Sequence, residues 1–424
     1  MKFPRFFGRE TKASETASTL VMTPGQPVWS GRDFAAFAKE GYQTNIVAAM
    51  SIQKIAESVS SVPIGLWRGE TEIEDHNLLT LFERPNPMQS GREYTEAVVS
   101  YLMIAGNSYE EQIEVNGEPR ELYALRPDRM SPIPGQSGFP VGYEYRGPNG
   151  GRVRYDIDAD AGVFPIWHTR FFNPLDDWVG QSPMEAGAYS IDQHNEAMGW
   201  MQGLLQNSAR PSGALVVQKD SSGAFRDLSP DAFSRLKQQI ADQYSGSRNA
   251  GRPMLLEGGL DWKAMGLSPS DVGIIEAKNS AARDVALAFG VPPMLLGIPG
   301  DNTYANYKEA RLAFWEDTVI PLVGRIAGER TQWLADDGME FRPDFSDVPA
   351  IIDKKASQWE AAEASTDLTI DERRAIKGYG PLPNGAGDVL PQQISQPAQH
   401  DVTDTNIKAM AKIAGYANAQ IDRK

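Results

Sequence analysis

The sequence predicts an α+β fold in which a mixed unit is followed by long helices and a small inserted module. Short β-rich runs between turn signals fill much of the segment 25–180. Two long helical patterns bracket residues 210–269, and helical patterns return after residue 303. The length of 424 residues allows two or three domains.

The composition narrows the class of protein. Hydrophobic residues make up 41% and charged residues 23% of the chain, as in globular proteins. No run of about 18 apolar residues occurs, so we expect no membrane span. The N-terminus "MKFPRFFGRE" is followed by a polar stretch, which does not match a secretory signal. The absence of cysteine excludes disulfides and thiolate metal sites and fits an intracellular protein.

The net charge of −15 opposes tight binding to nucleic acid, which needs a basic face. It indicates either ordinary acidic solubility or a surface that passes near DNA without adhering to it. Residues 25–180 hold 22 acidic and 13 basic residues, a net charge of −9. Residues 210–269 hold 6 acidic and 8 basic residues, a net charge of +2, so this middle segment differs in sign from the rest.

The N-terminal part of the chain alternates between helices and strands. Residues 1–24 are polar and without periodicity, which is typical of a flexible arm. Helical spacing is present over residues 43–62 and 91–106, the second ending at Gly106. Between them, "VPIGLWRG" predicts a strand and "EIEDHNLLTLFERPNP" a short helix. The later β-rich runs predict a meandering sheet, so residues 25–180 form one α+β unit.

A long helix is predicted over residues 181–209. Ser182 is a candidate N-cap, and Pro183 suits the first helical position. The helical pattern would span about 27 residues, or roughly 40 Å. Gly199 and Gly203 stand one turn apart, which indicates either simple tolerance of glycine or close approach to another helix.

Residues 210–269 are predicted to be a small module of strands and one helix, and residues 270–290 a second long helix. A module at the end of two helical legs suggests a lever or a spout. Beyond it, Pro292 and Pro293 end the helix, and a short apolar run follows on a loop. Loops are normally polar, so the apolar side chains of this loop require a surface to contact.

The C-terminal third is mostly helical. One helical pattern extends from Tyr304 to about Leu334, and Pro321 is expected to kink or break it. Residues 347–378 predict further helices, with a capping box at Thr369 and Glu372. A Pro- and Gly-rich linker and a tail follow.

The search for catalytic motifs finds little. No phosphate-binding loop and no H-E-x-x-H motif is present. The stretch from Gly180 to Met184 begins like a nucleophile elbow but lacks its final glycine. The four histidines lack metal-ligand spacing, and the acidic pairs at Asp176 and Asp336 are better explained as turn residues. We therefore expect a protein that is not an enzyme, without catalytic residues, metal site or cofactor.

Several stretches, in their order and spacing, carry a resemblance to a known family. They are "VGQSPMEAGAYSI", "LSPDAFSRLKQQIADQYSG", "PMLLEGGLDWKAMGLSPSD", "FGVPPMLLG" followed by "NTYANYKEARLAFWEDTVIPL", and "LTIDERRAIKGYGPLPNGAGD". Over roughly residues 30–390 the chain resembles the portal proteins of long-tailed double-stranded DNA bacteriophages and related gene transfer agents. Those proteins form a ring, usually of twelve copies, at one capsid vertex, and DNA is packaged and ejected through its channel.

The resemblance implies a name for each part of the chain. Residues 25–180 would form the wing (α+β), and the helices 181–209 and 270–290 the stem. Residues 210–269 would form the small α/β clip. Residues 291–345 would hold the tunnel loop and a long wing helix, 346–390 the helical crown, and 391–424 a C-terminal tail, with 1–24 as the arm.

The resemblance also implies partners and a location. The chain would contact its own copies in the ring, double-stranded DNA without sequence preference, the terminase, the head–tail adaptor and the major capsid protein. It would assemble in the host bacterial cytoplasm and remain in the virion at the capsid vertex, with no membrane contact.

Site residues follow from the same resemblance. An apolar lip offers no cations to hold phosphates, so DNA could slide past it. Leu296 and Ile298 would lie at the narrowest part of the channel, unless they pack in the subunit's own core. The expected channel lining is Met294, Leu295, Leu296, Ile298, Asp301, Asn302 and Tyr304. The expected clip contacts are Arg226, Arg235, Lys237, Arg248 and Arg252.

Two other functions stay open at this point. A head-completion or tail structural protein without a DNA channel would share the acidic, cysteine-free composition. A capsid-associated hydrolase would need a titratable cluster in a cleft, and the motifs above provide none.

Overall fold

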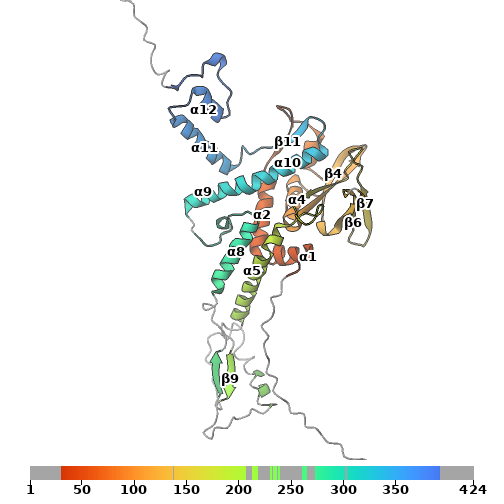
Figure 1. Cartoon of the computed structure of the whole chain (residues 1–424), viewed down its shortest axis with the longest axis vertical. Coiled ribbons are helices and arrows are strands. Elements are labelled where there is room, and N and C mark those ends of the chain that lie inside the picture. Colours follow the sequence, from red (N-terminus) through yellow and green to blue (C-terminus); the bar gives the residue numbers. More distant parts are fainter. Residues whose placement is uncertain are drawn as a thin grey trace, which may run out of the picture.

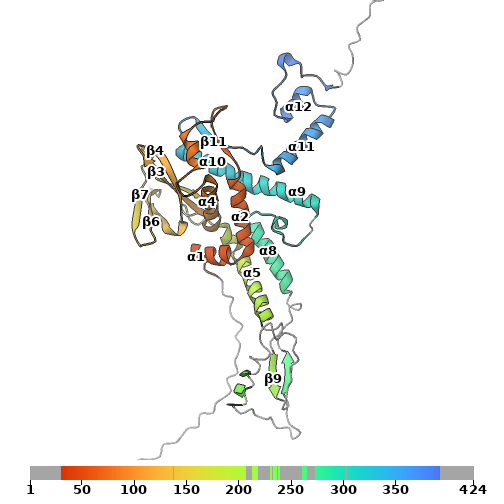
Figure 2. The same cartoon turned by 180° about the vertical axis from the view of Figure 1, so that it is seen from behind.

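A computed structural model describes residues 30–136, 138–206, 213–217, 230–231, 233–235, 237–238, 260–264, 273–300 and 303–391. The molecule is elongated, and its mixed α/β body lies near the middle (Figure 1). Two helices, α5 and α8, lead from this body to the strand β9, whereas α11 and α12 lie on the opposite side (Figures 1 and 2).

The first helices of the body begin and end where side chains satisfy their free backbone groups. A short helix α1 (Phe34–Ala36) and a π-helical turn (Phe37–Gln43) precede α2 (Ile46–Ser60), while α3 (Asn77–Glu83) precedes α4 (Gly91–Ala105). Ser90 and Glu93 form a reciprocal capping box at the start of α4. Gly106 ends α4 in the left-handed conformation with φ of 72°.

Three antiparallel sheets of three strands each surround these helices. One has the order β4–β3–β8, built from β3 (Asn107–Val115), β4 (Glu118–Leu125) and β8 (Ile166–Arg170). Another has the order β5–β6–β7, built from β5 (Met130–Pro134), β6 (Pro140–Arg146) and β7 (Arg152–Asp156). A 3₁₀ turn, Pro127–Arg129, connects the two.

The third sheet joins distant parts of the sequence. Its order is β11–β1–β2, with β1 (Ile64–Arg68), β2 (Thr71–Ile73) and β11 (Met339–Pro343). Leu66 pairs with Phe341 across it, and both side chains are buried. The segment "EIEDHNLLTLFERPNP", predicted as a helix, therefore begins as strand β2 and becomes helical only at Asn77.

Helical backbone continues from Tyr304 to Leu334, as predicted, but in three parts. They are α9 (Tyr304–Ala313), a π-helical segment (Phe314–Val319) and α10 (Ile320–Leu334). Pro321 stands in the first turn of α10. Since proline has no N–H to donate, the hydrogen-bond ladder is disturbed in the turn before it, and the helix passes through a π-bulge rather than stopping.

The core explains how the long helices are held. The largest cluster of buried side chains draws on α2, α4, α5, α8 and α10, including Ile52, Ile55, Val285 and Val323. A second cluster, around Leu66, Tyr94 and Phe341, lies below the third sheet. The N-terminal part of α5 and the C-terminal part of α8 thus belong to the core of the body. The other ends of both helices extend away from the body (Figure 1).

The C-terminal helices are more exposed than those of the body, although Ala350 of α11 belongs to the largest core cluster. They are α11 (Pro349–Ala364) and α12 (Ile370–Ile376), followed by a 3₁₀ turn at Pro383–Gly385. The predicted capping box at Thr369 and Glu372 is present, with both reciprocal hydrogen bonds. No helix within the described ranges is long and apolar enough to cross a membrane.

Candidate functional site

The helix α5 (Pro183–Gln206) begins at a cap that also ties it to the body. The hydroxyl of Ser182 accepts a hydrogen bond from the Met184 N–H and donates one to the Met103 carbonyl, both at 3.0 Å. The predicted N-cap is therefore confirmed, and it fixes the start of α5 against the end of α4. The observed helix ends at Gln206, close to the predicted end.

The helix α8 (Ile274–Ala288) runs back toward the body beside α5 (Figures 1 and 2). The two helices approach closely at Gly187, where an added Cβ would lie 3.1 Å from the Cβ of Ala288. By contrast, a Cβ added at Gly199 or Gly203 would meet no neighbouring atom of the described residues within 4 Å. Within one subunit the close approach is thus made by Gly187 and not by the predicted pair.

A buried polar cluster fastens α5 to α2. The side-chain oxygen of Asn45 caps α2 by accepting from the N–H groups of Val47 and Ala48, each at 3.1 Å. Its amide nitrogen donates to the side-chain oxygen of Asn195 at 2.9 Å and lies 3.2 Å from Nδ1 of His194. One buried side chain therefore orients both a body helix and the long helix that leaves the body.

At the far end of α5 and α8, two strands pair. They are β9 (Gly213–Val217) and β10 (Leu260–Ala264), antiparallel, with Leu215 opposite Trp262. These are strands within the segment 210–269, where strands were predicted. Arg235 and Lys237 are exposed, and Arg235 Nε donates to the Asp231 carbonyl at 3.3 Å. The other expected clip contacts, Arg226, Arg248 and Arg252, lie outside the described residues.

The connection from α8 to α9 is anchored at its start. Gly290 adopts the left-handed conformation with φ of 67°, which favours glycine. The Thr318 hydroxyl donates to the Gly290 carbonyl at 2.7 Å, and Val291 is buried. The next residues form a 3₁₀ turn, Pro293–Leu296, so the loop after the two prolines has a definite geometry at its start.

The apolar run then turns inward. Gly297 is left-handed, and the Ile298 N–H reaches back to the Pro293 carbonyl at 3.2 Å. As a result the Ile298 side chain is only 8% exposed and belongs to the largest core cluster. The expectation that Ile298 faces a channel is therefore wrong for this subunit. Leu295 and Leu296 are partly buried against the same core.

Contacts of α8 and of the α9 cap flank the last part of the loop. Arg283 donates to the Pro299 carbonyl, and the Thr303 hydroxyl accepts from the Asn306 N–H at 3.2 Å. Met294 is half-buried, Asp301 and Asn302 lie outside the described residues, and Tyr304 is the first residue of α9. Thr303 could have been predicted as a cap from its residue type, whereas nothing local marks Arg283 or Thr318 as an anchor.

Another group of buried ionisable side chains lies in the body, on β3, β8 and α10. Arg330 and Glu110 form a buried ion pair at 3.7 Å, and the Tyr94 hydroxyl donates to Glu110 at 2.5 Å. Burial lowers the pKa of His168 to about 3 and raises the pKa of Glu329. Among the described residues, no three His, Asp or Glu side chains are grouped to hold a metal ion.

Comparisons with known proteins show which proteins this chain resembles. The family model of the phage portal protein matches residues 47–378. An uncharacterized protein of Rickettsia felis is 39% identical over 356 residues, which cover 82% of this chain and 89% of that protein. The portal protein of Enterobacteria phage HK97 is 24% identical over 71% of this chain and 69% of its own length.

One solved structure adds a likeness in three dimensions. A chain in the neck of a native gene transfer agent particle, computed with C12 symmetry, is 42% identical to this one. The alignment covers 84% of this chain and 96% of that chain, with a TM-score of 0.63. The match thus includes both the sequence and the arrangement of the elements described above.

Proposed function

The chain belongs to the phage portal protein family, and from this premise we propose that it forms the ring-shaped channel at a capsid vertex through which double-stranded DNA is packaged and ejected. The observation that carries the proposal is the pair α5 and α8. These two helices lead from the core of the body to the strands β9 and β10. The chain that contains them is 42% identical to a chain in the neck of a gene transfer agent particle. The family is structural rather than enzymatic, so a hydrolase and a part without a channel are set aside.

The ring is proposed to hold twelve copies of the chain. This number rests on the C12 symmetry of the neck that contains the similar chain. A cyclic ring requires heterologous contacts, in which one face of a subunit meets a different face of its neighbour. The far half of α5 offers such a face, because Gly199 and Gly203 have open space and Trp200 and Leu205 are exposed.

The tunnel loop is proposed to place residues 294–296, together with Asp301, Asn302 and Tyr304, toward the channel. Ile298 is assigned a different role, as the apolar anchor that holds the loop on the core. A lip without cations and with one acidic side chain does not bind phosphates, which suits a channel that DNA must leave again.

The experiment that tests the channel changes the charge of the loop. Asp301→Arg with Asn302→Arg adds two phosphate-binding groups per subunit to the lip. We expect intact rings but slower packaging or slower release of DNA from assembled particles. The matched control, Asp337→Arg, changes a similar charge on an exposed turn of the body and should leave both rates unchanged. Normal packaging and release in the loop variant would remove the loop from the channel.

The clip is proposed to dock the terminase during packaging and the head–tail adaptor afterwards. Its net charge of +2 in a chain of −15 supports contact with acidic protein surfaces. Reversing Arg248 and Arg252 together should weaken terminase docking while the ring stays intact. Unchanged docking, measured by co-sedimentation with purified rings, would exclude these two arginines as contacts. The major capsid protein is proposed to contact the body of the subunit.

A further inference from the structure

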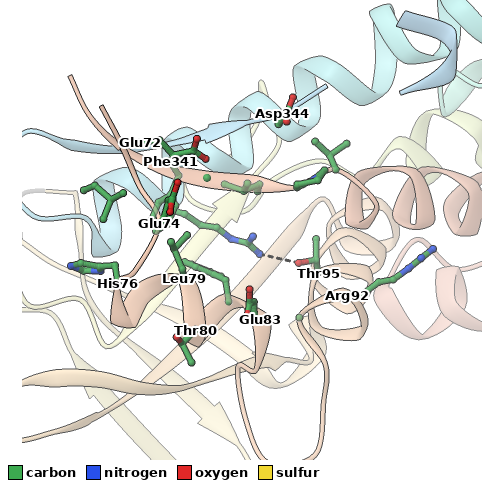
Figure 3. A pocket seen from close by; sticks show the side chains of 18 of the residues that line it. Glu72, Glu74, His76, Leu79, Thr80, Glu83, Arg92, Thr95, Phe341 and Asp344 are labelled. Atoms are coloured by element: carbon green, nitrogen blue, oxygen red, sulfur yellow. Dashed lines mark hydrogen bonds between the residues drawn. The ribbon is translucent and has the colours of Figure 1, made fainter. Parts of the chain in front are cut away.

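A cavity of about 790 Å³ lies in the body, away from α5 and α8. It opens between the β1–β2 hairpin, helix α3, the first turns of α4 and the chain that follows β11 (Figure 3). The proposed channel and clip do not use this region.

The rim of this cavity is acidic. Glu72 and Glu74 come from β2 and the residue next to it, Glu83 from α3, and Asp344 from the end of β11, and their side chains surround the opening (Figure 3). Asp75 adds a fifth carboxylate, and all five residues are exposed. None of them forms an ion pair with a cation within the described parts of the chain.

The floor is formed by a buried arginine on an apolar base. Arg330 is only 3% exposed, its guanidinium carbon lies 4.5 Å from the ring centre of Phe82, and Nη2 donates to the Thr95 hydroxyl at 3.4 Å (Figure 3). Its Nε has no hydrogen-bond partner among the described residues. The cavity thus has a buried arginine and an aromatic ring beneath it and negative charge at its rim.

One wall of the cavity is the edge of a sheet. In the order β11–β1–β2, the strand β2 pairs with β1 on one side, and no described strand pairs with its other side. An open strand edge is a template for an added extended segment, which gains backbone hydrogen bonds along the edge. Glu72 and Ile73 belong to this strand and line the cavity.

We propose that the N-terminal arm of this chain, residues 1–29, docks along β2 and over this cavity. The first twelve residues carry four basic side chains and one acidic side chain, which complement the acidic rim. Phe3, Phe6 and Phe7 supply apolar groups for the base around Phe82. The arm thus carries four basic side chains and three phenylalanines within its first twelve residues.

The length of the arm permits this docking. The described chain starts at Ser30, whose N–H donates to Asp192 of α5 at 3.0 Å. An extended segment of 29 residues spans up to about 95 Å, at roughly 3.3 Å per residue. The arm can therefore reach the cavity of its own subunit or that of an adjacent copy, and either arrangement is docking in the proposed sense.

The absence of cysteine permits a direct test by site-specific cross-linking in the full-length protein. Gly8→Cys in the arm is combined with Thr71→Cys on β2 and treated with a short bis-maleimide. The matched control combines Gly8→Cys with Val115→Cys, which is exposed at the end of β3 in a different sheet from β2. We expect a yield at Thr71 several times that at Val115, decreasing as salt screens the charges.

Charge reversal makes the test specific. Glu74→Lys with Asp75→Lys should lower the Thr71 cross-link about fivefold, the range of exposed ion pairs. Adding Arg5→Glu and Arg9→Glu to the same protein should restore the yield. Thermal melting checks that the variants remain folded. Equal yields at Thr71 and Val115, or reversal of the acidic rim without effect, would overturn the proposal and leave the cavity to a different partner.

Discussion

At the scale of single residues, His168 is held neutral by its surroundings. Asn107 Oδ1 accepts the Gly180 N–H at 2.7 Å, so this oxygen faces the His168 Nε2 at 2.9 Å as an acceptor. The Nε2 therefore carries the ring proton. The ring is stacked on Tyr109 at 4.2 Å, and burial lowers its pKa to about 3.

This low pKa predicts a defined dependence of stability on pH. Above the ordinary histidine pKa of about 6.5, His168 is neutral in both states and contributes no pH dependence. Below it the unfolded state binds the proton first, so the free energy of unfolding falls by about 1.4 kcal/mol per pH unit until pH approaches 3. Urea unfolding measures the decrease in the free energy of unfolding between pH 7 and pH 5. We expect this decrease to be about 2 kcal/mol smaller in His168→Phe than in the unsubstituted protein. An equal difference in both proteins would contradict the assignment.

The burial of Ile298 leads to a second prediction. Truncating a buried aliphatic side chain removes core contacts, so Ile298→Ala should lower the free energy of unfolding by about 2–5 kcal/mol. Ile352→Ala is the control, because Ile352 is 46% exposed on α11 and its truncation should cost less than about 0.5 kcal/mol. Thermal denaturation of both variants decides this, and equal melting temperatures would return Ile298 to the surface of the loop.

The orientation of Ile298 could not be predicted from the sequence, whereas the helix caps could. Ser182 and Thr369 were predictable as caps because the signal for a helix cap is local. The direction of Ile298 depends on Gly297 turning the chain back toward a core assembled from α2, α8 and α10. No local pattern distinguishes an apolar residue on a loop that faces a channel from one that faces its own core.

At the scale of elements, Asn45 joins two helices that are far apart in sequence. Asn45→Ala should lower the free energy of unfolding by about 2–4 kcal/mol, because it removes a helix cap and leaves buried groups of α5 without a partner. Ser90→Ala removes a cap from α4 at an exposed position and should cost about 1 kcal/mol. If the two substitutions lower the free energy of unfolding by the same amount, the hydrogen bonds from Asn45 to α5 do not contribute to stability.

The packing of α5 on α8 can be tested with glycines of the same helix. Gly187→Val places methyl groups against Ala288 and should destabilise the subunit by about 1–3 kcal/mol. Gly199→Val meets no described atom of its own subunit and should leave the stability of the isolated subunit unchanged or slightly raised, since glycine disfavours helix. Melting temperatures of the two variants provide the comparison, and a larger loss at Gly199 would contradict the packing described here.

Most elements were predictable, and the exceptions have physical causes. Helical periodicity and caps located α2, α4, α5 and α8 to within a few residues. The pairing of β1 with β11 was not predictable, because most of the described chain separates the two strands in the sequence and pairing leaves no local signal. The π-bulge before Pro321 was predicted as a kink or break, since proline marks the place but not the form of the distortion.

At the scale of the whole molecule, a single subunit leaves apolar surface without a partner. Exposed large hydrophobic side chains occur along α5 and α8, namely Met198, Trp200, Leu205, Ile275 and Leu287. Such surface is typical of contacts between chains. The sequence predicted the two helices and the module at their end, but the surfaces that meet between copies depend on a symmetry that one chain does not encode locally.

The central claim is that this chain closes into a ring with a channel. Native mass spectrometry of the purified full-length protein at micromolar concentration, with electron microscopy of the same sample, tests it most directly. The account predicts a closed assembly of twelve subunits with a central opening, as in the C12 neck that holds the similar chain. Only monomers and dimers across a range of salt concentrations, or an assembly without a central opening, would contradict it.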